Sequence, residues 1–173
     1  MILNTKRLTL RPFSAQDFAD ACEIFEDDLT CRYLLHDPWR PDNRERAFAE
    51  KLQQNMLTQL GKLSLACLLE SKMIGELVFW YTGMRQTVEI GFVFNRAFAG
   101  QGYASEAARA LVEWLFEKED VHRIQANLDA RNIASSRVCE RIGMRREAHF
   151  LKDFWNKDEW TDSFVYGMLR TDL

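Results

Sequence analysis

The chain has 173 residues, enough for one domain with a sizeable core, and its 47% hydrophobic and 28% charged residues are typical of a globular protein. Its net charge of −3 provides no basic surface for nucleic acid, and no apolar run reaches the roughly 20 residues that a membrane-spanning helix needs. The four cysteines are scattered and the start of the chain carries no secretion signal, so we expect reduced thiols, no metal and a cytoplasmic location.

The first part of the chain predicts a strand, two helices and an irregular loop between the helices. Alternating residues predict the strand over 5–13, and Ser14 is a suitable N-cap for the helix that follows. Two prolines and several aromatic residues over 31–42 predict the loop. The second helix is expected over 43–60, because Gly61 is a typical residue at a helix C-terminus.

The rest of the chain predicts a sheet with two further helices. Apolar residues at helical spacing predict helices over 103–118 and 132–142. Short turns join the three strands that precede the first of these helices, which favours antiparallel hairpins. Besides the segment 5–13, the expected strands cover 63–70, 73–81, 87–95, 122–129, 144–154 and 160–169. With no repeat or linker, the sequence predicts one α/β (α+β) domain over 1–173, with a mixed, mostly antiparallel sheet of seven strands and flanking helices.

The run Gly100-Gln101-Gly102-Tyr103-Ala104 begins just before the helix expected over 103–118 and ends with the first two residues of that helix. Glycines there allow the backbone to approach a ligand closely, because they have no Cβ atom. The first N–H groups of the helix have no partner inside it, and the helix dipole is positive at that end. The run therefore predicts a seat for a phosphate or pyrophosphate, with a tight turn that binds nothing as the alternative.

A dinucleotide-binding loop is a second alternative, and three features count against it. The third glycine is missing, since Ser105 and Glu106 stand where it should fall. Residues 96–100 separate the strand from the glycines, whereas a dinucleotide loop follows its strand closely. The preceding strands are joined by hairpins, which predicts a mixed sheet rather than a parallel one. A Walker loop is excluded, because no Gly-Lys-Ser or Gly-Lys-Thr follows.

A second motif stands in residues 130–144, ARNIASSRVCERIGM. It matches the pattern N-x-x-S-x-x-V-x-E-K/R-x-G-F through Asn132, Ser135, Val138, Glu140, Arg141 and Gly143. With the upstream segment EIGFVFNRAFAGQGYASEA, it resembles the GNAT superfamily of acyl-CoA-dependent N-acetyltransferases. The opening TKRLTLRPFSAQD and the closing WTDSFVYGMLR resemble its RimJ/RimL branch, which acetylates protein N-terminal amines and some small-molecule amines.

The resemblance implies a sheet that is splayed between its fourth and fifth strands, 87–95 and 122–129, with acetyl-CoA in the gap. Backbone groups of 92–94 would pair with the pantetheine arm, and backbone N–H groups of 100–104 would hold the pyrophosphate. Asn132 would bond the cofactor near its amide or thioester end. The positions that match the family's coenzyme contacts are Phe92, Val93, Phe94, Gly100, Gln101, Gly102, Tyr103, Ala104, Asn132 and Ser135.

Two positions depart from the family pattern. The family's loop has Gln or Arg three residues before its first glycine, but this position is Ala97, and the adjacent Arg96 is a candidate replacement or a solvated surface residue. Many members place a Tyr as proton donor to the thiolate where this chain has Cys139. In the RimJ/RimL branch a Ser three residues after the Asn is proposed for this role, and Ser135 matches it; the alternative is a hydroxyl that helps to cap the helix.

Three carboxylates are candidates for the general base. Glu89 shares a strand face with Gly91 and Val93, so it can look into the acceptor side; the alternative is an ordinary solvent-facing glutamate. Asp153 lies near the place where the RimJ/RimL branch carries a catalytic carboxylate, although Phe154 occupies the matched position. Glu76 is the weakest of the three.

The acceptor site is expected in the variable front of the fold. Its candidate residues are Tyr33, Leu34, His36, Trp39 and Trp80, with Trp155 and Trp160 as a lip. The alternative for these aromatic residues is that they pin a loop and a hairpin onto the core.

These features predict an acetyl-CoA-dependent N-acetyltransferase that acts on a primary amine by direct attack in a ternary complex. The amine is a protein N-terminal α-amine or a small-molecule amine. The alternative from another class is a non-catalytic acyl-CoA-binding or sensor protein on the same fold, suggested by Cys139 and by the unassigned base. We expect no nucleic-acid or membrane partner, and the sequence leaves the oligomeric state open, a homodimer included.

Overall fold

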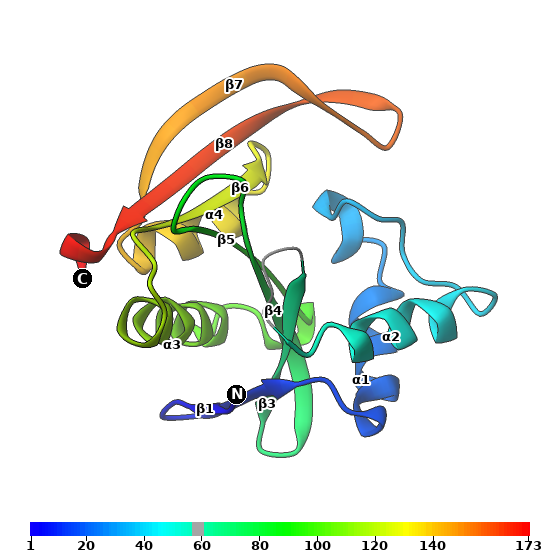
Figure 1. Ribbon diagram of the computed structural model, residues 1–173. Coiled ribbons are helices and arrows are strands. Elements are labelled where there is room, and N and C mark those ends of the chain that lie inside the picture. Colours follow the sequence, from blue (N-terminus) through cyan, green and yellow to red (C-terminus); the bar gives the residue numbers. More distant parts are fainter. Residues whose placement is uncertain (57–60) are drawn as a thin grey trace.

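All strands that the structure describes join one mixed sheet. The structure, a computed structural model, describes residues 1–56 and 61–173. In this part of the chain the sheet has eight strands in the order β1-β2-β3-β4-β5-β6-β8-β7, and only β5 and β6 run parallel (Figure 1). The strands are β1 (Leu3–Asn4), β2 (Leu8–Pro12), β3 (Lys62–Leu69), β4 (Lys72–Tyr81), β5 (Thr87–Phe94), β6 (Arg123–Asp129), β7 (Arg145–Asn156) and β8 (Glu159–Leu169).

Helices cover both faces of the sheet. The helices α1 (Phe18–Phe25) and α2 (Arg44–Gln53) lie on one side, and α3 (Tyr103–Lys118) and α4 (Ile133–Arg141) lie on the other (Figure 1). The predicted apolar stripe of α3 is buried in the larger of two cores, since Leu111, Val112 and Leu115 are almost fully inaccessible. The smaller core lies beneath α1 and α2. One face of β5 therefore lies against the larger core and the other against the smaller core, as the alternation of its residues predicts.

The sheet divides between β5 and β6. These strands pair only where Thr87–Glu89 meet Arg123–Gln125. Beyond this point β5 continues to pair with β4 as far as Phe94, and β6 continues to pair with β8 as far as Asp129. The predicted splay between the fourth and fifth expected strands is thus confirmed. The edge of β5 beyond Glu89 is left without a partner strand in the described structure.

The structure differs from the expected elements near the N-terminal side of the sheet. The strand expected over 5–13 is the shorter β2 (Leu8–Pro12). The residues before it form β1, which pairs with β2 as a hairpin and adds an eighth strand to the seven expected. The helix expected over 43–60 is wrong in its length, because α2 ends at Gln53; the positions 57–60 lie outside the described residues. The helix ends early because the backbone carbonyl and the side chain of Gln54 both accept hydrogen bonds from Ser64, at 2.9 and 2.6 Å, which turns the chain towards β3.

Ser14 has the capping position that the sequence predicts, but for a different element. It precedes a 3₁₀ turn over Ala15–Asp17, and α1 begins only at Phe18. The carboxylate of Asp17 accepts the backbone N–H of Ser14 at 2.8 Å. The same carboxylate binds Arg11 at 2.8 Å, so this ion pair fixes the entry into α1.

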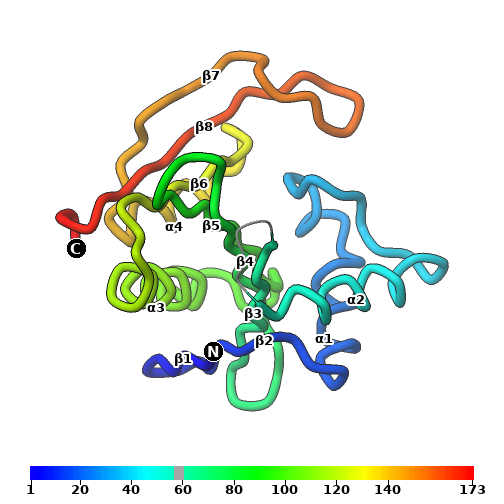
Figure 2. Tube along the Cα trace, viewed as in Figure 1, coloured from blue at the N-terminus to red at the C-terminus, as the bar shows by residue number. Residues whose placement is uncertain are grey.

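The strands β7 and β8 form a long hairpin that arches over the rest of the protein (Figures 1 and 2). Its turn, Lys157-Asp158, has positive φ angles of 49° and 62°, which is the geometry of a tight two-residue hairpin turn. A bulge interrupts the pairing between Phe150 and Phe154. Within the bulge Lys152 has a φ of 50°, and its backbone N–H donates to Asp162 at 3.0 Å.

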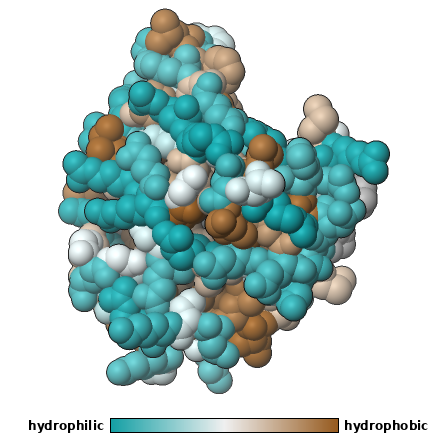
Figure 3. Space-filling model, turned by 90° about the vertical axis from the view of Figure 1, so that its left-hand side faces the viewer, coloured by the Kyte–Doolittle hydropathy of each residue, from teal (hydrophilic) through white to brown (hydrophobic). Residues whose placement is uncertain are grey.

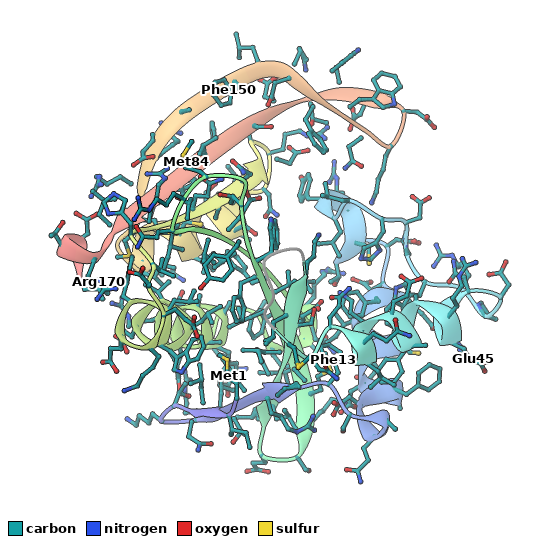
Figure 4. All side chains as sticks on the ribbon, viewed as in Figure 1. Met1, Phe13, Glu45, Met84, Phe150 and Arg170 are labelled. Atoms are coloured by element: carbon teal, nitrogen blue, oxygen red, sulfur yellow. The ribbon has the colours of Figure 1, made fainter. Side chains whose placement is uncertain are left out.

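The arch carries apolar side chains on its surface. Phe150, which Figure 4 labels on the arch, and the adjacent Leu151 are 50% and 72% exposed. The face that bears α3 and the C-terminus is mostly hydrophilic, with separate apolar patches at its top, across its middle and at its bottom (Figure 3). None of the helices in the described residues combines the length and the hydropathy that crossing a membrane requires.

Candidate active site

Glu89 lies on β5 at the point where the two halves of the sheet separate. Its carboxylate accepts hydrogen bonds from two side-chain amides of β6, Gln125 Nε2 at 2.9 Å and Asn127 Nδ2 at 2.8 Å. Both amides donate to the same oxygen, Oε2. Within the described part of the chain, the other oxygen, Oε1, accepts no hydrogen bond. Glu89 is therefore held firmly at one oxygen while the other can accept a proton.

The two amides that hold Glu89 were not identified from the sequence. Gln125 and Asn127 alternate along β6 with Ile124 and Ala126, which are buried in the larger core. The signal was therefore present: polar amides occupy the open face of a strand whose other face is buried. What the sequence could not show is that this face lies beside β5.

The glycine run forms the predicted entry into α3. Gly100 and Gly102 have φ angles of 78° and 81°, in the left-handed region that residues with a Cβ atom rarely adopt. Gly102 is the N-cap of α3, so the first N–H groups of this 16-residue helix lie directly behind it. Such an end favours an anion through its free N–H groups and its dipole. The backbone of 100–104 therefore fits the diphosphate of a coenzyme.

The unpaired edge of β5 holds Phe92, Val93 and Phe94, at the positions that the sequence predicts for pantetheine contacts. Because β6 has turned away, backbone groups on this side of β5 have no partner strand in the described structure. An amide-rich chain can pair with such an edge as an additional strand would. The strand edge and the glycine run therefore fit two parts of coenzyme A.

Asn132 is the N-cap of α4. Its side-chain oxygen Oδ1 accepts the backbone N–H of Ser135 at 3.1 Å. The capping bond thus uses the backbone of Ser135 and not its hydroxyl, so the alternative that the hydroxyl caps the helix is not observed. The hydroxyl of Ser135 is partly exposed near the start of α4.

Two further groups near α4 are buried. Burial raises the pKa of the Cys139 thiol to about 12, so this residue stays protonated and inert at neutral pH. Tyr166 is fully buried on β8, and its hydroxyl donates to Glu140 at 3.0 Å. Burial raises the pKa of Tyr166, and the bond to Glu140 adds to the effect. Cys139, at the position that matches the family's tyrosine donor, is therefore no substitute for it at neutral pH.

The other two candidate carboxylates differ in surroundings from Glu89. Asp153 is exposed in the bulge of β7, and within the described residues it makes no ion pair. Glu76 is only 2% exposed on β4, and the ammonium of Lys51 binds both of its oxygens at 2.8 and 2.9 Å. Both carboxylate oxygens of Glu76 are thus used in a buried ion pair, whereas Oε1 of Glu89 accepts no hydrogen bond from the described residues and is available to an amine.

The loop before α2 reaches the β7–β8 turn from the opposite side of the gap (Figures 1 and 2). Lys157 Nζ donates to the carbonyl of Cys31 at 2.6 Å, and Asn156 Nδ2 donates to the carbonyl of Leu34 at 3.4 Å. Arg131 lies over the ring of Tyr33 and binds Glu159 at 2.8 Å. These contacts connect the loop before α2 with the β7–β8 hairpin and with the start of α4.

The aromatic residues predicted for the acceptor site have different surroundings. Trp39 is buried and stacks on Phe25 with ring centroids 4.6 Å apart, so it pins the loop onto the smaller core. His36 is exposed and contacts the carbonyl of Asp37. Trp155 and Trp160 are exposed and pack edge to face on the hairpin.

Comparisons with known proteins agree with this geometry. The family model of the acetyltransferase (GNAT) domain matches residues 7–145. The chain is 35% identical to the uncharacterized N-acetyltransferase YnaD of Bacillus subtilis over 172 residues, 99% of each chain.

Solved structures show the same fold. A GNAT-family acetyltransferase from Bacillus anthracis is 32% identical, with a TM-score of 0.87 over 99% of each chain. RimL, a ribosomal-protein alpha-N-acetyltransferase in complex with coenzyme A, shares the fold at 17% identity, with a TM-score of 0.81 over 98% of each chain. The splayed sheet, the glycine entry into α3 and the matched family model lead to one conclusion: the chain belongs to the GNAT family of acetyltransferases.

Proposed function

We propose that this acetyltransferase uses acetyl-CoA to acetylate a primary amine by direct attack in a ternary complex, with Glu89 as the general base. The observation that carries the proposal is the carboxylate of Glu89, fixed at Oε2 by Gln125 and Asn127 where the gap between β5 and β6 begins. A base that is held in place and has one oxygen to offer meets the geometric requirement for proton transfer. We take residues 1–173 as one catalytic domain. The four cysteines are free thiols, which supports the proposal that the protein works in the reducing cytoplasm.

The residues of the gap have separate roles in this proposal. Backbone N–H groups of 100–104 hold the diphosphate, and the edge of β5 over 92–94 pairs with the pantetheine amides. When bound, acetyl-CoA supplies the thioester carbonyl. Glu89 Oε1 takes the proton of the amine whose nitrogen forms the new C–N bond. The hydroxyl of Ser135 gives a proton to the thiolate when the C–S bond breaks and regains one from solvent, to which Glu89 releases the proton of the amine. Asn132 orients the thioester end.

The acceptor is proposed from the chemistry of amines. A protein α-amine, with a pKa of about 7.7–8, is roughly one-tenth neutral at pH 7, whereas a lysine side chain, at about 10.4, is neutral in only about 0.04% of molecules. The protein α-amine needs less help to lose its proton, so a single carboxylate base such as Glu89 is sufficient for it. A protein N-terminus or a small-molecule amine of similar basicity is therefore the favoured acceptor.

Calorimetry and a CoA-release screen test the proposal. We expect acetyl-CoA to bind, and CoA to be released with some member of a panel of N-terminal peptides, polyamines, amino acids and aminoglycosides. Binding of CoA without release across the panel would favour the acyl-CoA sensor, which is the second candidate because Cys139 stands where many family members have the tyrosine donor. No binding of CoA at hundreds of micromolar would contradict both.

Replacing Gly102 with valine should weaken acetyl-CoA binding. A β-branched residue at a φ of 81° is strained by about 1–2 kcal/mol, so the loop will relax and move its N–H groups. We expect the KM for acetyl-CoA to rise by about 5- to 30-fold. Gly83→Ala is the matched control, because a Cβ there meets nothing within 4 Å and should leave KM unchanged.

Replacing Ser135 with alanine tests the proton donor. The thiolate of the leaving coenzyme, with a pKa near 8.5, needs modest help, so we expect kcat to fall by about 10- to 100-fold. The helix cap should survive, because the bond to Asn132 comes from the backbone N–H. Thermal denaturation should therefore be that of the wild type. An unchanged kcat would remove Ser135 from the mechanism.

A further inference from the structure

The turn between β1 and β2 is docked on the first turn of α3. Glu106 accepts three hydrogen bonds from it: Thr5 Oγ1 at 2.6 Å, the backbone N–H of Arg7 at 2.9 Å and Arg7 Nε at 2.7 Å. Burial by itself raises the pKa of Glu106, but the bonds from Thr5 and Arg7 outweigh it and lower this pKa. The TKRL segment is thus anchored by a charged carboxylate 99 residues away in the chain.

From this anchor the guanidinium of Arg7 reaches three consecutive residues of the glycine loop. Arg7 Nη1 donates to the carbonyl of Gln101 at 3.0 Å. The guanidinium lies over the ring of Tyr103, 4.3 Å from its centroid. Nη2 is 3.6 Å from the point that a Cβ atom on Gly102 would occupy. Arg7 therefore borders the middle of the loop, from Gln101 to Tyr103.

The bond to Gln101 has a direct effect on the anion seat. A carbonyl oxygen that turned into the seat would repel a phosphate, and Arg7 holds this oxygen to itself. The neighbouring N–H groups can then point to the anion. Arg7 also offsets the charge of Glu106 in the first turn of α3, beside a loop in which Ala97 occupies the position where the family pattern has Gln or Arg.

Arg96, the other candidate for this role, is placed differently. Its guanidinium lies 3.5 Å from the carboxylate of Asp27 and is 55% exposed. It makes no hydrogen bond to the loop among the described residues. The charged contact to the glycine loop therefore comes from the N-terminal hairpin.

We propose that Arg7 is the positioning residue for the phosphate-bearing end of acetyl-CoA, in place of the side chain that Ala97 lacks. The proposal rests on the proposed function, since it requires coenzyme binding at α3. In this proposal, the ion pair of Arg7, in the N-terminal hairpin, with Glu106, in α3, serves to hold Arg7 beside the glycine loop.

The test is the change in coenzyme affinity of Arg7→Gln and Arg7→Lys. Glutamine keeps one donor for Gln101 but has no charge, and lysine keeps the charge but cannot bind Glu106 and Gln101 together. For Arg7→Gln we expect the calorimetric Kd for CoA and the KM for acetyl-CoA to rise by about tenfold, with kcat at saturation within about twofold of wild type. Arg7→Lys should recover part of the affinity.

Arg11→Gln is the matched control. Arg11 lies on β2, four residues after Arg7, and binds the carboxylate of Asp17 near α1, away from the glycine loop. It should lower the melting temperature and leave the Kd for CoA unchanged. If Arg7→Gln also lowers stability without changing this Kd, or lowers kcat as much as affinity, the positioning role is wrong. If wild-type protein does not bind CoA, the proposed function itself fails.

Discussion

Replacing Glu89 with glutamine should lower kcat by about 100- to 1,000-fold and leave the KM for acetyl-CoA within about twofold of wild type. The substitution keeps the shape of the side chain, and an amide oxygen can still accept the bonds from Gln125 and Asn127. It removes only the capacity to take a proton. Steady-state kinetics with the amine from the release screen measures both constants.

The melting temperature separates this role from a structural one. Glu89→Gln should melt like the wild type, because Gln125 and Asn127 can still donate to its side-chain oxygen, while kcat is lost. Asp153→Asn, measured beside it, decides between the two carboxylates. A large loss of kcat in Asp153→Asn with little change in Glu89→Gln would transfer the role of base to Asp153. Glu113→Gln on the exposed side of α3 controls for loss of charge.

Replacing Glu76 with alanine should destabilise the fold by about 3 kcal/mol, because it leaves the ammonium of Lys51 without its partner in a mostly buried place. For a chain of this size the melting temperature should fall by roughly 6–12 °C. Differential scanning calorimetry measures this shift. The variant should bind CoA normally at low temperature, because Glu76 lies outside the proposed coenzyme contacts.

Two controls define the origin of this effect. The double variant Lys51→Met with Glu76→Leu removes both charges, so most of the lost stability should return. Arg40→Ala breaks an ion pair with Asp28 that is largely exposed, and it should change the stability by less than about 1 kcal/mol. A double variant as unstable as Glu76→Ala would show that packing, and not the unpaired charge, causes the loss.

The order of elements and the geometry of the glycine run were accessible from the sequence because their signals are local. The stripe of α3 and the alternation of β5 come from residues close in the chain, and both are confirmed. The left-handed glycines at 100 and 102 follow from the same stretch. The splay was expected from the resemblance, since no local pattern reveals where two strands separate.

The partners of the site residues could not be predicted, because they come from distant segments. Glu89 is held by Gln125 and Asn127 only because β6 lies beside β5. The pairing of Lys51 with Glu76 joins α2 to β4 in the same way. The end of α2 was predicted too late because Ser64, ten residues away, competes for Gln54.

The bulge in β7 has a consequence for solubility. β7 is the last strand of the sheet, and its twelve residues leave one side without a neighbouring strand in the described structure. A straight edge of this length, with Phe150, Phe154 and Trp155 exposed, would be a template for other chains to add to. Lys152, in its left-handed conformation, bends the strand between the aromatic residues and places a charge there. We therefore expect the bulge to oppose edge-to-edge aggregation.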